Sequence, residues 1–155
     1  MPEDNLSHID FNELDSKAIS HPLVNHIYTA DPSAHVFNGR IYIYPSHDIE
    51  NDIPFDDLGS HFAMEDYHVL SMDAPDAAVI DHGIALHVND VTWAEKQMWA
   101  PDAAEKDGKF YLYFPAKRPD GIFQIGVALS DKPEGPFLPE PTAIENSYSI
   151  DPAVF

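Results

Sequence analysis

The 155-residue sequence carries 8 Lys and Arg against 27 Asp and Glu, a formal net charge of −19, and it contains no cysteine. Its length fits one domain or part of a larger one. Eight cations cannot form the basic face that nucleic-acid phosphates or an anionic membrane would need, so we expect neither partner. Without thiols there is no disulfide, thiolate metal site or cysteine nucleophile. Carboxylate and histidine chemistry remain.

Residues 1–20 are interpreted as a lead-in segment. The sequence MPEDNL at residues 1–6 lacks the basic and apolar regions of a secretion signal. If Met1 is the native start, this predicts a cytoplasmic protein. No stretch approaches the ~20 apolar residues of a membrane-spanning helix. The 14 prolines and 7 glycines lie scattered between short apolar runs, which indicates many turns and no long helix.

An internal repeat organises the chain. Residues 30–46 align with residues 99–115 on Gly39 and Gly108, 69 positions apart. In both segments a Pro-x-Ala sequence leads to a polar-Gly-basic turn and then to a strand that alternates apolar residues with tyrosine. Asn-Gly and Asp-Gly pairs are strong hairpin signals, because a type I′ turn needs positive φ at both central positions. The repeat therefore predicts two equivalent hairpins.

The similarity continues beyond the hairpins. Residues 69–76 resemble 127–134, which leaves an insertion of 11 residues in the first unit, within the acidic stretch 48–62. A third unit opens at 149–155. Each complete unit predicts four short strands, at about 32–37, 41–46, 67–72 and 78–85 in the first and 101–106, 110–115, 122–129 and 137–144 in the second. Repeated units of four antiparallel strands are typical of β-propellers, which have 4–8 blades.

These segments resemble the glycoside hydrolases of family 43, the β-xylosidase and α-L-arabinofuranosidase group, from about His21 to Phe155. The resemblance is carried by ADPSA at 30–34, WAPDA at 99–103, Ser130 with GPF at 135–137, and SIDP at 149–152. It implies an all-β, five-bladed propeller in the full protein. This chain would supply blade 1 at about 30–90, blade 2 at about 99–145 and the first strand of blade 3 at about 149–155. The remaining blades would come from the rest of the polypeptide or from another chain.

The resemblance also implies inverting hydrolysis that releases xylose or arabinose from short plant-polysaccharide oligosaccharides. Asp31 matches the general base, and Asp151 matches the residue that orients the acid and modulates its pKa. The acid itself would be a glutamate beyond Phe155. Glu134 is not taken as the acid, because the repeat alignment places it between outer strands of the second unit. In the alternatives, each Asp-Pro is a turn that caps a strand entry, and the protein is a non-catalytic carbohydrate-binding propeller or an inactive fragment.

Four further residues are candidates for sugar binding. Trp99 precedes the inner strand of the second unit, where an indole could stack on a sugar ring. Trp93 lies six residues earlier, and His47 and Lys117 follow equivalent second strands. The alternatives are buried aromatic residues between blades for the two tryptophans and ordinary loop residues for the other two.

We expect no catalytic metal and no required cofactor. Four potential ligands, His61, Glu65, Asp66 and His68, lie within eight residues, but the sequence has no His-Glu-x-x-His motif. The family resemblance alone allows a structural calcium ion. The acidic insertion is interpreted as a solvated loop or, alternatively, as a lid over the sugar pocket with Phe55 or Phe62 as its apolar contact.

Overall fold

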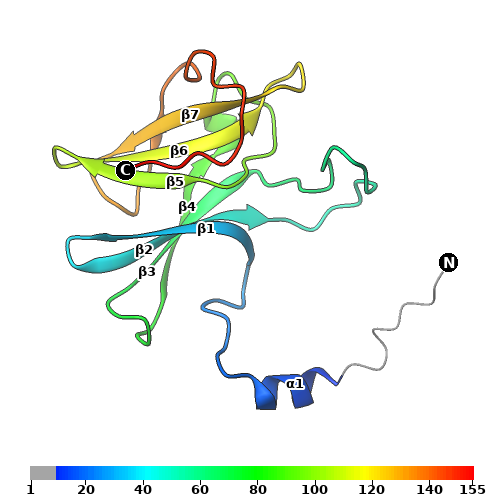
Figure 1. Cartoon of the computed structure of the whole chain (residues 1–155), viewed down its shortest axis with the longest axis vertical. Helices are drawn as coiled ribbons and strands as arrows, with labels where there is room; N and C mark the ends of the chain where they lie inside the picture. Colours follow the sequence, from blue (N-terminus) through cyan, green and yellow to red (C-terminus); the bar gives the residue numbers. More distant parts are fainter. Residues whose placement is uncertain (1–9) are drawn as a thin grey trace.

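The computed structural model describes residues 10–155, which form two four-stranded antiparallel sheets (Figure 1). In both sheets neighbouring strands follow one another along the chain. The first sheet contains β1 (Tyr28–Phe37), β2 (Arg40–Asp48), β3 (Asp66–Met72) and β4 (Ile80–His87). The second contains β5 (Asp102–Lys106), β6 (Lys109–Lys117), β7 (Phe123–Ser130) and β8 (Leu138–Pro139). The all-β class and the four strands of each unit are confirmed.

The two hairpins of the repeat are equivalent. Asn38 and Gly39 connect β1 to β2 with φ values of 52° and 79°, and Asp107 and Gly108 connect β5 to β6 with 54° and 75°. Positive φ at both central positions is the signature of the two-residue turn that suits the twist of paired strands. The predicted equivalence of the two glycine turns is therefore confirmed.

The outer strands differ from the expectation. The outer strand of the second sheet is only Leu138–Pro139, whereas the sequence suggested 137–144. Proline lacks the N–H that a ladder needs, and Pro139 and Pro141 fall in this stretch. In the first sheet the outer strand runs over Ile80–His87, two residues later than expected.

Two short helical segments were not predicted. Helix α1 (Phe11–Lys17) lies in the lead-in segment, away from the sheets (Figure 1), and a 3-10 turn covers Val88–Asp90. The Asp10 side chain caps α1 by accepting a hydrogen bond from the Glu13 N–H at 3.1 Å. Within residues 10–155 no helix is long and apolar enough to cross a membrane. Residues 1–6, on which the prediction of a cytoplasmic protein rests, lie outside the described residues.

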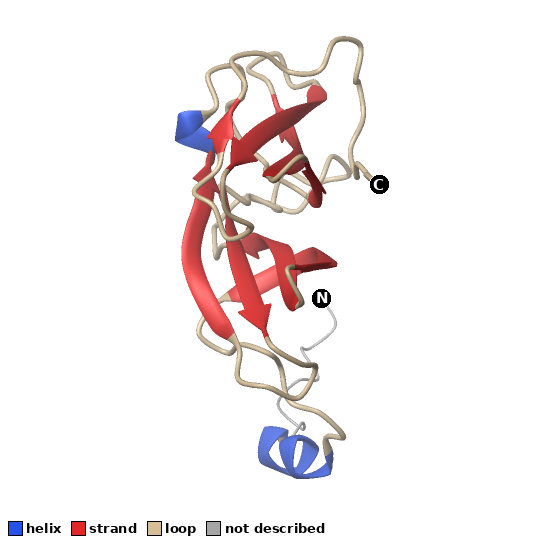
Figure 2. Cartoon of the chain, turned by 90° about the vertical axis from the view of Figure 1, so that its left-hand side faces the viewer, coloured by secondary structure: helices blue, strands red, loops and turns tan. Residues whose placement is uncertain are grey.

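The core lies where the two sheets meet (Figure 2). Tyr44 is fully buried, and its hydroxyl donates a hydrogen bond to the Pro133 carbonyl at 2.7 Å, which links β2 to the turn after β7. Gly126 lies under the aromatic ring of Phe114, where a Cβ atom would come within 2.5 Å of the ring, and close to Trp93. Between the sheets, Phe37 of β1 meets Phe110 of β6 edge to face, with the ring centroids 5.2 Å apart. Aromatic contact and buried apolar area therefore hold the sheets together.

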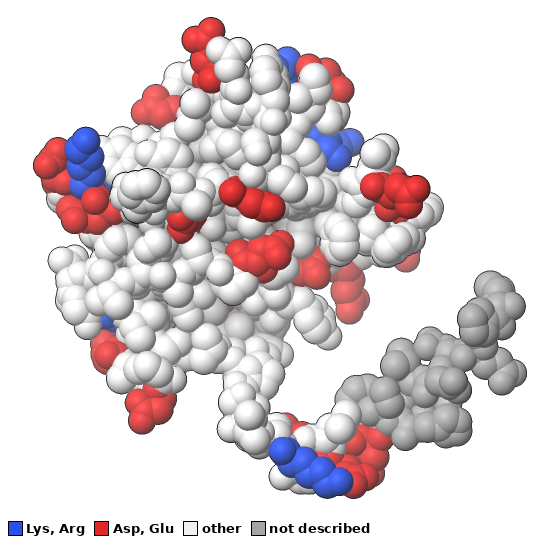
Figure 3. Space-filling model, in the orientation of Figure 1, with Lys and Arg blue, Asp and Glu red and all other residues white. Residues whose placement is uncertain are grey.

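The surface charge is dispersed. On the face shown in Figure 3, Lys and Arg side chains stand singly among more numerous acidic groups. Five of the cations form ion pairs with neighbouring acidic groups: Lys17 with Glu13, Arg40 with Asp73, Lys96 with Glu95, Lys109 with Asp131, and Arg118 with Asp120. This face therefore offers no continuous basic area.

Candidate active site

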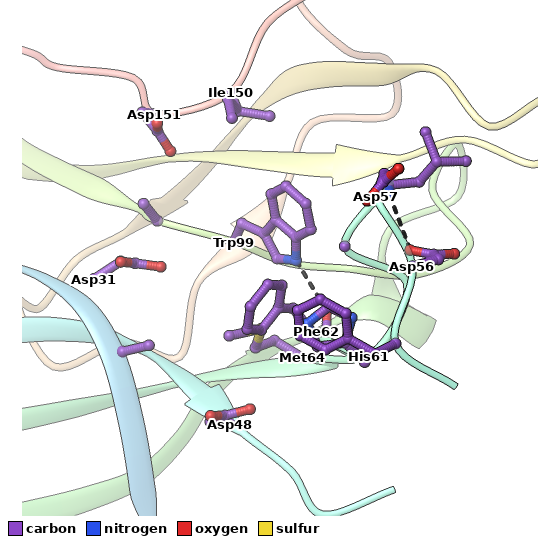
Figure 4. Close-up of a pocket in the computed structure, with 15 residues that line it drawn as sticks. Asp31, Asp48, Asp56, Asp57, His61, Phe62, Met64, Trp99, Ile150 and Asp151 are labelled. Atoms are coloured by element: carbon purple, nitrogen blue, oxygen red, sulfur yellow. Dashed lines mark hydrogen bonds between the residues drawn. The ribbon is translucent and has the colours of Figure 1, made fainter. Parts of the chain in front are cut away.

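A pocket of about 740 Å³ forms where the two sheets and the C-terminal segment meet (Figure 4). Three equivalent pairs of residues line it: Ala30-Asp31, Trp99-Ala100 and Ile150-Asp151. In the repeat alignment these pairs occupy the same position of the first, second and third units. Equivalent positions of the three repeat units thus line the same pocket. The second residue of the pair is an aspartate in the first and third units and an alanine in the second.

Asp31 and Asp151 share an unusual backbone conformation. Their φ values are 49° and 55°, in the left-handed region that aspartate tolerates better than most residues. At Asp31 the register between β1 and β2 shifts between Ala30 and Ser33, and such bulges redirect side chains at functional sites. In Figure 4 both carboxylates point into the space beside Trp99. The structure therefore brings together the two carboxylates that the sequence singled out.

Trp99 is fixed in the pocket wall from two sides. Its indole Nε1–H donates a hydrogen bond to the Phe62 carbonyl at 2.9 Å, and its own carbonyl accepts one from the Tyr67 hydroxyl at 2.6 Å. The Nζ atom of Lys117 lies over the indole ring, 5.8 Å from the ring centroid. Burial, together with the charge of Lys96, lowers the pKa of Lys117. Lys117 therefore supports Trp99 and does not line the pocket.

The inserted loop lines the other side of the pocket. Phe55 stacks on His61 at 4.0 Å, and the His61 ring also lies 4.0 Å from that of Phe62. Both ring nitrogens of His61 are buried without a hydrogen-bond partner. Hydrogen bonds from Ser60 lower the pKa of Asp56, which also lines the pocket. The loop thus contributes both apolar and acidic groups to the pocket lining, while Phe55 itself is 84% exposed; the lid over the pocket stays a prediction.

Trp93 and His47 lie elsewhere. Trp93 stacks on Phe114 with the ring centroids 6.0 Å apart and lines a second pocket of about 640 Å³ beside β7. His47 points toward Asp66, with Nδ1 2.9 Å from Oδ1. Neither residue lines the pocket that contains Asp31. Sugar binding by Trp93, His47 and Lys117 stays a prediction.

Asp102 is a residue that sequence reasoning missed. One of its carboxylate oxygens lies 2.6 Å from Nε2 of His35 in β1, and the other accepts a hydrogen bond from the Val154 N–H at 2.8 Å. Burial acts to raise the pKa of Asp102, but hydrogen bonds from Val154, His35 and Ala103 lower it overall. Asp102 therefore connects β5, β1 and the segment that carries Asp151. The sequence signal that could have identified Asp102 is its place in the WAPDA motif at 99–103.

One group of side chains in residues 10–155 has three potential metal ligands within reach of a single ion: His47, Asp66 and His68. Calcium prefers six to eight oxygen ligands, so two imidazoles and one carboxylate do not fit it. The structural calcium that the resemblance allows stays a prediction, and the chemistry considered below does not depend on it.

The fold and the pocket define the class of this protein. It is an all-β protein built from repeated antiparallel sheets, with two aspartates at equivalent positions of one pocket. The model of the protein family described as "Glycosyl hydrolases family 43" matches residues 79–155. Xylosidase/arabinosidase 43A of Humicola insolens is 65% identical over 136 residues, which cover 86% of this chain and 42% of the relative. A xylosidase/arabinosidase of Bacteroides ovatus is 55% identical over 83% of this chain and 40% of its own length. The chain belongs to glycosyl hydrolase family 43, which confirms the resemblance.

Solved structures agree with this assignment. A β-xylosidase/α-arabinofuranosidase of the family from a compost microbial metagenome, crystallised with xylotriose in a calcium-free form, has a TM-score of 0.86 at 65% identity. It is matched over 87% of this chain and 41% of its own length. The Xanthomonas citri enzyme crystallised with xylotriose has a TM-score of 0.82 at 62% identity, over 93% of this chain and 41% of its own. This chain spans about two fifths of the length of these relatives.

Proposed function

We propose that the full-length protein is an inverting glycosidase that releases xylose or arabinose from short plant-polysaccharide oligosaccharides. In this proposal the present chain supplies the general base, Asp31, and Asp151, which orients the acid and modulates its pKa. The observation that carries the proposal is the convergence of both carboxylates on one pocket beside Trp99. The names of the two relatives and the xylotriose bound in two neighbours support a pentose-containing substrate.

The chemistry divides the work among three carboxyl groups. An ionised base removes a proton from water while an acid protonates the leaving oxygen, and the two groups lie roughly 6.5–9.5 Å apart to hold that water. Asp31 is exposed to the pocket, which leaves its carboxylate accessible to a water molecule. A second carboxylate near the acid raises the acid's pKa by repulsion between like charges, and we assign that role to Asp151. The acid would come from outside this chain.

The proposed architecture is a five-bladed propeller whose first two blades are the two observed sheets. Residues 149–155 would open the third blade. The pocket would then be part of the central funnel, with Asp31, Ala100 and Asp151 at the entry of successive inner strands. The inserted loop supplies part of the pocket lining, and the pocket volume of about 740 Å³ is consistent with a substrate as small as a short oligosaccharide.

The first test is the variant Asp31→Asn in the full-length protein. General base catalysis contributes about 10²–10⁴-fold, so kcat on an aryl pentoside should fall by at least that range while xylotriose still binds. Asp76→Asn, an exposed loop variant, is the matched control and should retain activity. Equal activity of Asp31→Asn and the wild type would refute the assigned base. Retained sugar binding without turnover in the wild type would instead support the non-catalytic alternative.

The second test addresses Asp151→Asn. Losing the negative charge lowers the pKa of the acid, so the alkaline limb of the kcat/KM profile should move to lower pH. Activity should fall less on substrates with good leaving groups, which need little protonation. If Asp151 only caps a strand entry, the variant will show lower thermal stability with an unchanged pH profile.

A further inference from the structure

Three side chains of the first sheet converge outside the pocket. Nδ1 of His47 in β2 lies 2.9 Å from Oδ1 of Asp66 in β3, and Nε2 of His68 lies 3.8 Å from the same oxygen. The potential ligand atoms of all three residues lie within 4.8 Å of one another. None of the three residues lines the pocket that contains Asp31.

Strand geometry explains this convergence. Asp66 and His68 are two positions apart in β3, so alternation places them on the same face of the sheet. The pairing of Ser46 with Tyr67 brings His47 next to them from the neighbouring strand. The side chains of His47, Asp66 and His68 are only 21%, 9% and 11% exposed. The cluster is therefore a shielded polar site.

A second carboxylate fixes the orientation of His68. Its Nδ1 lies 2.9 Å from Oδ1 of Asp81 in β4, and Nε2 of His26 lies 2.7 Å from the other oxygen of Asp81. When His68 donates its Nδ1–H to Asp81, the tautomer assigned from this network leaves a lone pair on Nε2. Histidines that bind metals typically donate their other ring N–H to a carboxylate in this way.

The lone pair of His68 then faces the Asp66 carboxylate across 3.8 Å, which is too long for a hydrogen bond. Two electron-rich groups at that separation favour a cation between them. Ligand atoms at about 2.0–2.1 Å from a tetrahedral zinc ion lie about 3.3–3.4 Å apart. The 2.9 and 3.8 Å separations in the cluster lie on either side of this value, and all three ligand atoms lie within 4.8 Å of one another.

We propose that His47 Nδ1, Asp66 Oδ1 and His68 Nε2 bind a divalent transition-metal ion, with zinc as the best match to the donor set. Imidazole suits zinc and its neighbours in the first transition row, whereas calcium and magnesium prefer oxygen. Three protein ligands leave a fourth position for water. The ion would cross-link β2 and β3 close to the point where β1 begins, so its effect is on the stability of the first sheet.

The test uses the full-length protein without a histidine tag, stripped of metal by a chelator and dialysed into buffer with excess calcium, which fills the oxygen-rich sites. Zinc chloride is then titrated and followed by calorimetry, and bound zinc is counted by mass spectrometry. The variants are Asp66→Asn, His68→Gln and His47→Gln at the ligands and Asp81→Asn behind them. His82→Gln removes an exposed histidine of the same sheet that is bonded to Ser71, and it serves as the matched control.

The wild type and His82→Gln should bind one more equivalent of zinc than Asp66→Asn or His68→Gln. Asp81→Asn should keep the site but weaken zinc binding about 10–100-fold, as loss of such an orienting partner typically does. Cobalt(II) should give a visible absorption band in the wild type that is absent from the ligand variants. Equal zinc stoichiometry in the wild type and the ligand variants would overturn the proposal. If circular dichroism shows that Asp66→Asn does not fold, His47→Gln decides, because His47 is the most exposed ligand.

Discussion

The hydroxyl group of Tyr67 should matter both for stability and for the pocket. Tyr67 is fully buried in β3, and its hydroxyl reaches the Trp99 carbonyl at 2.6 Å and, more weakly, that of Pro115 at 3.5 Å. Tyr67→Phe keeps the ring and its edge contact with Phe114 and removes only the hydroxyl. The Trp99 carbonyl oxygen then loses the hydrogen bond that the Tyr67 hydroxyl donates to it.

The expected cost follows from that lost donor. A hydrogen bond contributes about 0.5–1.5 kcal/mol net, but leaving a buried partner unsatisfied costs about 1–3 kcal/mol. We therefore expect Tyr67→Phe to lower the free energy of unfolding by about 1–3 kcal/mol, a factor of roughly 5 to 150 in the unfolding equilibrium. Tyr44→Phe is the matched control. Tyr44 is equally buried and donates to the Pro133 carbonyl, outside the pocket, so its stability loss should be similar.

Urea unfolding followed by tryptophan fluorescence measures the stability change, and xylotriose titration measures the effect on the pocket. Only Tyr67→Phe should also weaken xylotriose binding, because only Tyr67 anchors the backbone of Trp99. The reasoning is refuted if Tyr67→Phe unfolds within about 0.5 kcal/mol of the wild type, the range of neutral surface changes. It is also refuted if both variants lose sugar affinity equally.

Two further predictions concern the core. Burial raises the pKa of Tyr67 and Tyr44 in the folded protein above the ordinary value of about 10. As the pH rises, the unfolded state therefore loses these protons before the folded state does. The free energy of unfolding should be unaffected below pH about 10 and should fall as the pH rises above it. Unfolding free energies measured between roughly pH 9 and pH 11 should show this decline, and the double phenylalanine variant should show a shallower one; identical slopes would contradict the argument. Gly126→Ala places a Cβ atom 2.5 Å from the Phe114 ring. This overpacking should lower the free energy of unfolding by about 1–3 kcal/mol, which thermal unfolding measures. An unchanged melting temperature would show that the Phe114 ring moves freely aside.

Local chemistry explains why much of the fold was predictable. Asn-Gly and Asp-Gly specify their turns within two residues, and the alternation of tyrosine with apolar residues sets the faces of the strands that follow. Because Asp31-Pro32 and Ala100-Pro101 lie at the same distance before these turns and Asp151-Pro152 opens the next unit, Asp31 and Asp151 could be assigned to equivalent positions. Their meeting in one pocket follows from that equivalence.

Contacts between residues that are far apart in the sequence explain the features that the sequence did not predict. The sequence suggests a strand that ends at residue 46, which made His47 either a sugar-binding candidate or an ordinary loop residue. Pairing of Tyr28 with Asp48 extends β2 and carries His47 into the sheet. Asp102 looked like part of a motif, and its partners His35 and Val154 are 67 and 52 residues away. No local pattern encodes such contacts.

The two bonds of Asp102 also bear on the order of folding. Its contacts with His35 and Val154 close long stretches of chain, and long loops must be closed at an entropic cost before their contacts stabilise the structure. Each hairpin, by contrast, needs only neighbouring residues. We therefore expect the two hairpins to form first and the segment that carries Asp151 to dock last, against a carboxylate already held by the first sheet. The pocket would then be the slowest part of this chain to mature, although the Asp-Pro segments that carry its two aspartates are readily recognised in the sequence.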